Sequence, residues 1–119
     1  MTITGIDHVQ VAAPAGCEAE ARAFYGALLG LEELPKPELL AACGGCWFRA
    51  GAQELHIGVE APFTPARKAH PGFVVADLAA LAERLAGEGI AVAWDEAIPG
   101  TERFHAADPF GNRLEFRRA

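Results

Sequence analysis

Three histidines and one glutamate stand at matching places in two segments of this chain that resemble each other. His8 lies in the stretch G-I-D-H-V-Q-V, and His70 lies 62 residues later in A-H-P-G-F-V-V. His56 lies in Q-E-L-H-I-G-V, and Glu115 lies 59 residues later in G-N-R-L-E-F. Imidazole nitrogens and a carboxylate form a common ligand set for a divalent first-row metal. The duplicated pattern therefore predicts a metal site.

The alternation of side chains along the expected strands places all four candidates on the polar side of a sheet. Leu55 and Ile57 share one face of their strand, and His56 lies on the other face. The other three candidates likewise stand opposite apolar residues that can pack against a helix. We therefore expect the four side chains to face away from the helices, in a concave cleft if the sheets curl.

The elements expected along the chain follow one order twice. The first copy is expected to contain a strand at 5–12, a helix at 17–29 and strands at 31–34, 46–50 and 53–59. The second copy is expected to contain a strand at 70–76, a helix at 78–86 capped by Asp77, and strands at 90–94, 103–107 and 112–117.

These elements predict an α+β fold of two βαβββ modules that form a curved, mostly antiparallel sheet cleft. Each copy is too small to bury a sheet face alone, so the two copies are expected to pack together. A chain of 119 residues is accordingly expected to form a single domain, with module one at about 1–60 and module two at about 70–119.

Composition and charge argue against several classes of protein. The formal net charge is -6 and no basic run occurs, which disfavours a nucleic-acid or anionic-membrane surface. No apolar stretch approaches the roughly 20 residues needed to span a bilayer. The three cysteines are an odd number and no secretion signal is evident, so we expect a cytoplasmic protein.

Three motifs carry a resemblance to a known family. They are D-H-V-Q-V at 7–11, F-Y-G-A-L-L-G-L-E at 24–32 and D-P-F-G-N-R-L-E-F at 108–116, of which the last is the most specific. On these motifs the chain resembles the vicinal oxygen chelate superfamily, and the match extends over nearly its whole length. That superfamily includes glyoxalase I, extradiol dioxygenases, methylmalonyl-CoA epimerase, fosfomycin-resistance transferases and bleomycin-resistance proteins.

The resemblance implies paired βαβββ modules whose sheets surround one metal ion. The family's ligand positions fall on His8, His56, His70 and Glu115. Members of the family are often dimers, and the two modules of one cleft can belong to different chains. The resemblance therefore implies a homodimer that binds a small-molecule substrate.

The sequence departs from glyoxalase I at one ligand position. Glyoxalase I usually has a glutamate where His56 stands, and it uses metal-bound carboxylates as bases. Glu115 remains available for that role, and Glu54 lies on the same face as His56. Extradiol dioxygenases use two histidines and one glutamate, which map onto His8, His70 and Glu115. His56 could then fill a position that dioxygen needs open.

We therefore expect a metal-dependent lyase or isomerase of the glyoxalase type, acting on a small oxygenated substrate that chelates nickel, zinc, iron or manganese. Glu115 is the expected proton shuttle, because it is the one carboxylate among the four candidates. The alternatives are an extradiol-type dioxygenase and a non-catalytic dimer that binds a drug or metabolite, as bleomycin-resistance proteins do. His105 falls outside the duplicated set and is expected to be a surface or cleft-lining residue.

Overall fold

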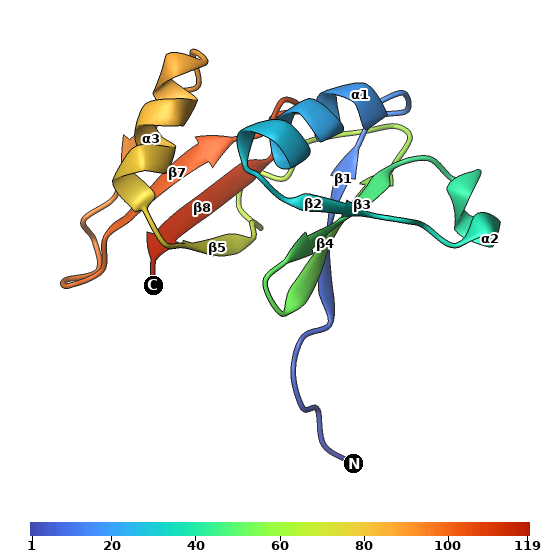
Figure 1. Ribbon diagram of the computed structural model, residues 1–119, viewed down its shortest axis with the longest axis horizontal. Coiled ribbons are helices and arrows are strands. Elements are labelled where there is room, and N and C mark those ends of the chain that lie inside the picture. The colour runs from blue at the N-terminus through green and yellow to red at the C-terminus, as the bar shows by residue number, and fades with distance from the viewer. The chain divides into compact units, whose positions relative to one another are not determined.

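The computed structural model describes all residues from 1 to 119 and divides into two compact units, Met1–Thr64 and Pro65–Ala119. Each unit contains one four-stranded sheet together with helical segments (Figure 1). The predicted α+β class and the predicted duplication are therefore confirmed. No helix has the length and apolar character that crossing a membrane requires.

Unit 1 contains the elements β1 (His8–Ala13), α1 (Glu18–Ala21), η1 (Arg22–Leu28), β2 (Glu32–Leu34), α2 (Glu38–Ala41), β3 (Cys46–Ala50) and β4 (Gln53–Val59). The strands β3 and β4 have the predicted bounds. The predicted helix at 17–29 changes from α to the wider π form at Arg22. At its end the Leu29 amide donates to the Phe24 carbonyl, five residues back, at 2.8 Å. The short α2 was not predicted.

Unit 2 contains the elements β5 (Gly72–Val75), α3 (Leu78–Gly87), β6 (Ala93–Trp94), β7 (Arg103–Ala107) and β8 (Arg113–Arg118). Asp77 caps α3 as predicted, because its side chain accepts a hydrogen bond from the Ala80 amide at 3.1 Å. The strand predicted at 90–94 begins later, at Ala93, since the Ile90 amide still donates to Leu85 of the helix. His70 lies two residues before β5.

The two sheets have the same topology. Their strand orders are β1-β4-β3-β2 and β5-β8-β7-β6, and in each the first pair is parallel and the other two are antiparallel. The register is also equivalent: Trp47 of β3 pairs with His56 of β4, and His105 of β7 pairs with Glu115 of β8. Position 47 of the first unit therefore corresponds to position 105 of the second.

The core of each unit lies on one face of its sheet. In unit 1, Leu55 and Ile57 are fully buried with Phe48 and Tyr25. In unit 2, Phe104 and Phe116 are fully buried. They are the middle of a row of rings with centroid separations between 5.1 and 5.4 Å, which runs from Phe73 to the half-exposed Trp94. The opposite face of each sheet is left for polar side chains, as the alternation predicted.

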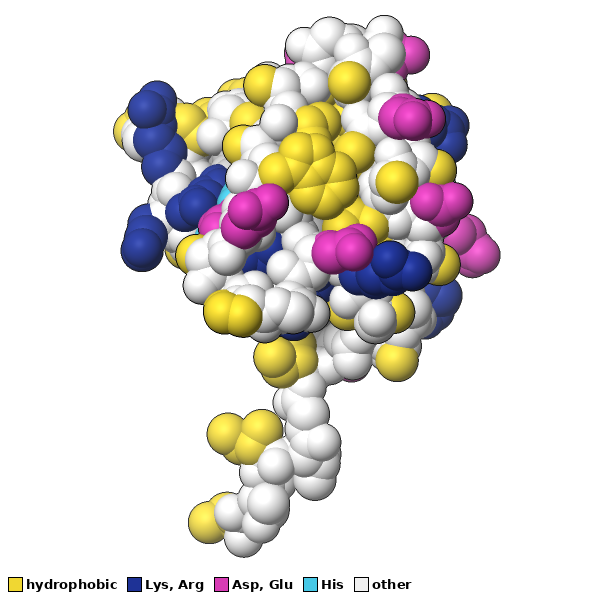
Figure 2. All heavy atoms as spheres, turned by 90° about the vertical axis from the view of Figure 1, so that its left-hand side faces the viewer, with side chains coloured by type: hydrophobic (Ala, Val, Ile, Leu, Met, Phe, Trp, Pro, Cys, Tyr) yellow, Lys and Arg dark blue, Asp and Glu magenta, His cyan; other side chains and the backbone are white.

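The first seven residues form no helix or strand and lead away from β1 as an extended segment (Figure 1). Figure 2 shows hydrophobic side chains along this segment. Met1, Ile3 and Ile6 are its exposed large hydrophobic residues. The segment contributes no residue to the core of unit 1.

Candidate metal centre

Three side chains of unit 2 that can bind a metal ion converge on one face of its sheet. His70, His105 and Glu115 each offer a ligand atom, and these atoms all lie within 4.8 Å of one another. The pairing of β7 with β8 places His105 directly beside Glu115. The parallel pairing of β5 with β8 places Gly72 on the other side of Glu115, and His70 precedes Gly72 by two residues. The sheet register therefore builds the cluster.

One carboxylate oxygen is the centre of this cluster. Glu115 Oε1 lies 3.1 Å from His70 Nε2, 3.2 Å from Arg103 Nη1 and 3.5 Å from His105 Nε2. Burial would raise the pKa of Glu115, but the hydrogen bond with His70 and the positive charge of Arg103 outweigh it and lower the pKa. Glu115 is therefore an ionised, nearly buried carboxylate surrounded by nitrogen atoms.

The hydrogen bonding of His70 fits a cation at this place. His70 Nδ1 lies 2.8 Å from the Lys68 carbonyl oxygen, which can only accept, so Nδ1 carries a proton. Nε2 faces the Glu115 carboxylate at 3.1 Å, as a donor when the ring carries a second proton and with a lone pair when the ring is neutral. Two electron pairs do not approach so closely unless a positive charge lies between them, either a proton or a metal ion. The donor set therefore fits a divalent metal.

His105 is held in the form that binds metals. Burial lowers the pKa of His105, and the charge of Arg113 lowers it further, so the ring is neutral at pH 7. Its Nε2 faces Glu115, while its Nδ1 lies 3.8 Å from Asp95 Oδ2. At 3.8 Å this carboxylate is beyond hydrogen-bond distance, but it lies behind the non-ligating nitrogen, where metal-binding histidines usually have their support. His105 is thus a ligand candidate that the sequence analysis placed outside the set.

In unit 1 the two predicted ligands stack on each other. The ring of His56 lies between Trp47, at a centroid distance of 3.9 Å and an interplanar angle of 2°, and His8, at 4.3 Å and 15°. A ring nitrogen binds a metal in the plane of its ring. In nearly parallel stacked rings these directions run side by side, so His8 and His56 would share an ion only if one ring turned.

In each of these rings, one nitrogen also contacts a carboxylate. His8 Nδ1 lies 2.9 Å from Asp7 Oδ2, and His56 Nε2 lies 3.0 Å from Glu54 Oε1. Proton donation to these oxygens leaves Nε2 of His8 and Nδ1 of His56 as the free acceptors. That both rings join His70 and Glu115 on one ion remains a prediction.

The signal for His105 lay in the alternation of β7 rather than in the duplication. His105 has Trp47 as its counterpart in the first unit, so comparing the two copies could not reveal it. The alternation, together with the antiparallel pairing of the last two strands, places His105 on the face of Glu115. The pairing register was the missing information.

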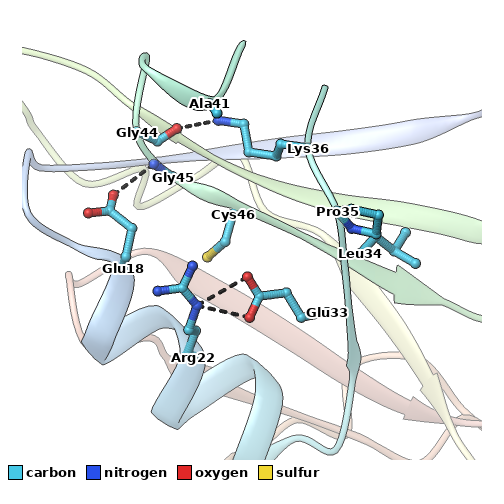
Figure 3. A pocket seen from close by; sticks show the side chains of 10 residues that line it. All are labelled: Glu18, Arg22, Glu33, Leu34, Pro35, Lys36, Ala41, Gly44, Gly45 and Cys46. Carbon is cyan, nitrogen blue, oxygen red and sulfur yellow. Dashed lines mark hydrogen bonds and ion pairs between the residues drawn. The ribbon is translucent and has the colours of Figure 1, made fainter. Parts of the chain in front are cut away.

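Unit 1 also contains a pocket of about 320 Å³ beside η1 (Figure 3). Its charged walls are satisfied within the protein. Arg22 Nε donates to both oxygens of Glu33 at 2.9 and 3.1 Å, Lys36 donates to the Gly44 carbonyl, and Glu18 accepts from the Gly45 amide at 2.7 Å. The pocket holds no cluster of metal-binding donors comparable with that of unit 2.

Comparison with known families agrees with this fold. The sequence model of the Glyoxalase/Bleomycin resistance protein/Dioxygenase superfamily matches residues 5–116. The chain therefore belongs to this superfamily, and the resemblance found in its motifs is confirmed. None of the curated proteins searched matches the chain.

Solved structures include a similar protein from Bacillus anthracis assigned to the glyoxalase family. It is 57% identical, with a TM-score of 0.96 over 99% of this chain and 97% of that chain. Lactoylglutathione lyase from Agrobacterium tumefaciens is 21% identical, with a TM-score of 0.76 over 100% and 96%. A fosfomycin resistance protein from Listeria monocytogenes is 14% identical, with a TM-score of 0.76 over 99% and 95%. The last two show likeness of fold.

Proposed function

We propose that this protein is a metal-dependent lyase or isomerase of the glyoxalase type, acting on a small oxygenated substrate. The observation that carries the proposal is the convergence of His70, His105 and Glu115 within 4.8 Å. The family membership and the 57% identical glyoxalase-family structure support it. The presence of these donors argues against a protein that only sequesters a drug or metabolite.

His70, His105 and Glu115 would hold the metal, with His8 and His56 as the further predicted ligands. A bound nickel, zinc, iron or manganese ion would supply Lewis-acid polarisation of two neighbouring substrate oxygens. The ligand types do not choose among these metals, since imidazole and carboxylate suit all four.

Glu115 is the proposed proton shuttle. It is ionised, because the hydrogen bond with His70 and the charge of Arg103 outweigh its burial and lower its pKa. An ionised carboxylate can accept a proton from a carbon next to a carbonyl group and return it to the neighbouring carbon. Its neighbour on the adjacent strand β5 is Gly72, which has no side chain to cover the carboxylate. Glu115 is thus placed to move a proton at one of its carboxylate oxygens.

A second candidate is an extradiol-type dioxygenase. Two histidines and one carboxylate are the ligand set of many non-haem iron(II) oxygenases, and unit 2 gathers such a set by itself. In this set His105 takes the place that the sequence analysis gave to His8, and both His8 and His56 must stay off the ion so that positions remain open for dioxygen. The stacking of those two rings is the observation that favours it.

The test combines metal loading with two activity screens. The protein is loaded separately with nickel, zinc, manganese and iron(II), and is assayed with methylglyoxal plus a thiol and with catechols under an oxygen electrode. Turnover without oxygen uptake supports the lyase or isomerase. Oxygen uptake with iron(II) alone supports the dioxygenase instead. Inactivity with every metal and substrate class, together with unchanged metabolite binding after chelation, would favour the binding protein.

Two isosteric variants test the role of Glu115. Glu115→Gln is expected to lower kcat by about 100-fold or more, which is the usual contribution of a general base. Glu83→Gln is the matched control, because Glu83 is exposed on α3 outside the cluster, and it is expected to leave kcat unchanged. Full activity of Glu115→Gln would remove the proposed proton shuttle.

We also infer a cytoplasmic homodimer with a small-molecule substrate. The superfamily membership supports the small-molecule substrate and the dimer. Light scattering coupled to size exclusion measures the mass directly, and a species of the single-chain mass, 12.6 kDa, would contradict the dimer.

A further inference from the structure

Arg103 lies beside the candidate metal centre and contacts two carboxylates at once. Its Nη1 lies 3.2 Å from Glu115 Oε1, and its Nη2 lies 3.0 Å from Asp95 Oδ2. The side chain is only 15% exposed, and its Nε is buried without a hydrogen-bond partner. A guanidinium group stays charged at any working pH. The positive charge of Arg103 thus lies beside Glu115 Oε1, the oxygen that also faces His70 and His105.

This contact has an electrostatic consequence. A divalent cation bound by Glu115 would lie close to the Arg103 guanidinium, and like charges in a nearly buried site repel with little screening by water. In the metal-free protein the same guanidinium neutralises Glu115. Arg103 therefore competes with a metal ion for one carboxylate.

Asp95 is placed to draw Arg103 away from Glu115. Its backbone amide donates to the Arg103 carbonyl at 3.0 Å, and its Oδ1 accepts from the Ala97 amide at 2.8 Å, so the side chain is fixed against the sheet. Asp95 Oδ2 faces both Arg103 Nη2 and His105 Nδ1, the latter at 3.8 Å. One carboxylate oxygen thus contacts the competing cation and lies behind a candidate ligand.

We propose that Asp95 and Arg103 are positioning residues that set the metal affinity of the candidate centre. Arg103 balances the charge of Glu115 when no cation is bound, and it remains with Asp95 when a cation takes its place. Asp95 also orients His105 toward the ion. The inference rests on the metal site of the proposed function, but it does not depend on the reaction catalysed there.

The proposal predicts opposite effects for the two partners of one ion pair. Arg103→Met removes the competing charge, so zinc affinity is expected to rise about tenfold. Asp95→Asn leaves Arg103 on Glu115 and releases His105, so zinc affinity is expected to fall about 10- to 100-fold, the usual cost of losing the support of a ligand. Zinc affinity is measured by competition with a chromophoric chelator.

A second ion pair on the same sheet supplies the control. Glu102 and Arg118 lie 3.3 Å apart and are well exposed, outside the cluster. Glu102→Gln and Arg118→Met are expected to leave zinc affinity within twofold of the unaltered protein. The visible absorption of the cobalt-loaded protein is an independent readout, and it should change in Asp95→Asn, because His105 shifts, but not in Glu102→Gln.

The outcomes separate this inference from the proposed function. If Arg103→Met loses as much zinc affinity as Asp95→Asn, then Arg103 only stabilises the structure of the site. That result would overturn the inference, even if the enzyme is active. Unchanged affinity in both variants would overturn it too. If the unaltered protein does not bind zinc, both the proposed metal-dependent function and this inference are contradicted. If Arg103→Met does not fold, Arg103→Gln gives the same comparison.

Discussion

His70 and Glu115 share a contact that needs a positive charge between them. The ring donates through Nδ1 to the Lys68 carbonyl, and its Nε2 lies 3.1 Å from the Glu115 carboxylate. Glu115 lies 45 residues after His70 in the chain. The contact therefore exists only through the pairing of β5 with β8. A pair of this kind is ready to accept either a proton or a metal ion.

Two histidine variants test which side chains bind the metal. If His105 is a ligand, His105→Ala should weaken zinc binding by about 10-fold or more, because a direct ligand matters at least as much as its outer support. His8→Ala is the comparison, since His8 belongs to the duplicated set and stacks on His56. Chelator competition decides between them. If His105→Ala keeps the zinc affinity of the unaltered protein and His8→Ala loses it, the ligands are those of the duplicated pattern and His105 is not one of them.

The three cysteines should differ in their reaction with iodoacetamide. Cys17 and Cys46 are 2% and 1% exposed, and burial raises the pKa of each thiol to about 11, whereas Cys43 is exposed. Alkylation requires the thiolate, so we expect rapid labelling of Cys43 alone at pH 8. Peptide mass spectrometry gives the three rates. Fast labelling of Cys46 in the folded protein would mean that the pocket beside it opens.

The same two thiols predict a loss of stability in alkaline solution. Their pKa lies near 9.0 when unfolded and at about 11 in the folded protein, so the unfolded chain ionises first as the pH rises. Stability is fully present below pH 9 and falls through pH 11, by about 3 kcal/mol per thiol. Urea titrations at each pH measure it. Cys17→Ala should make the slope shallower, while Cys43→Ala should leave it unchanged.

Gly45 is expected to tolerate no side chain. Its φ is +82°, and a Cβ there would lie 2.0 Å from the Ile57 carbonyl oxygen on the adjacent strand. Backbone strain and overpacking together should cost about 3 kcal/mol in Gly45→Ala. Gly51→Ala is the control, because Gly51 has a φ of +62° with no atom within 4 Å and should lose only about 1 kcal/mol. Urea denaturation compares the two; equal losses would contradict the clash.

Asn112 should act as a structural anchor rather than a substrate contact. It is 1% exposed, donates to Asp108 Oδ2 at 2.9 Å and accepts from the Ala66 amide at 3.0 Å. Asn112→Ala removes both hydrogen bonds, one of them to the buried Asp108 carboxylate, which should cost about 2 to 4 kcal/mol. The exposed amide of Gln53 is the control, and Gln53→Ala should change stability by less than about 0.5 kcal/mol. A stable Asn112→Ala protein with lost activity would instead indicate a direct role at the site.

The sequence predicted the repeated elements well because each one carries a local signal. The strands at 46–50, 53–59 and 103–107 have the bounds that alternation gave them, and Asp77 caps its helix. The π form of Arg22–Leu28 could not be predicted, since it arises from a shift of backbone hydrogen bonds that leaves the apolar spacing almost unchanged. Local patterns therefore fixed where elements lie, but not the detailed form of this helix.

The candidate site was predictable only in part. Duplication pointed to His70 and Glu115, which the structure brings together. It missed His105 and the roles of Asp95 and Arg103, because these depend on which strand residues pair across β6, β7 and β8. Predicting charge contacts between strands requires knowing which residues pair, and the amino-acid sequence alone does not specify that register.

Positions 47 and 105 occupy equivalent places in the two sheets but carry different side chains. Where one half places an indole against an imidazole, the other places an imidazole against an acid. The same pair of strand positions can therefore carry side chains for aromatic stacking or for ion binding on an equivalent backbone. A protein built in this way can gain or lose a reactive centre in either half through a few substitutions, while its strands stay where they are.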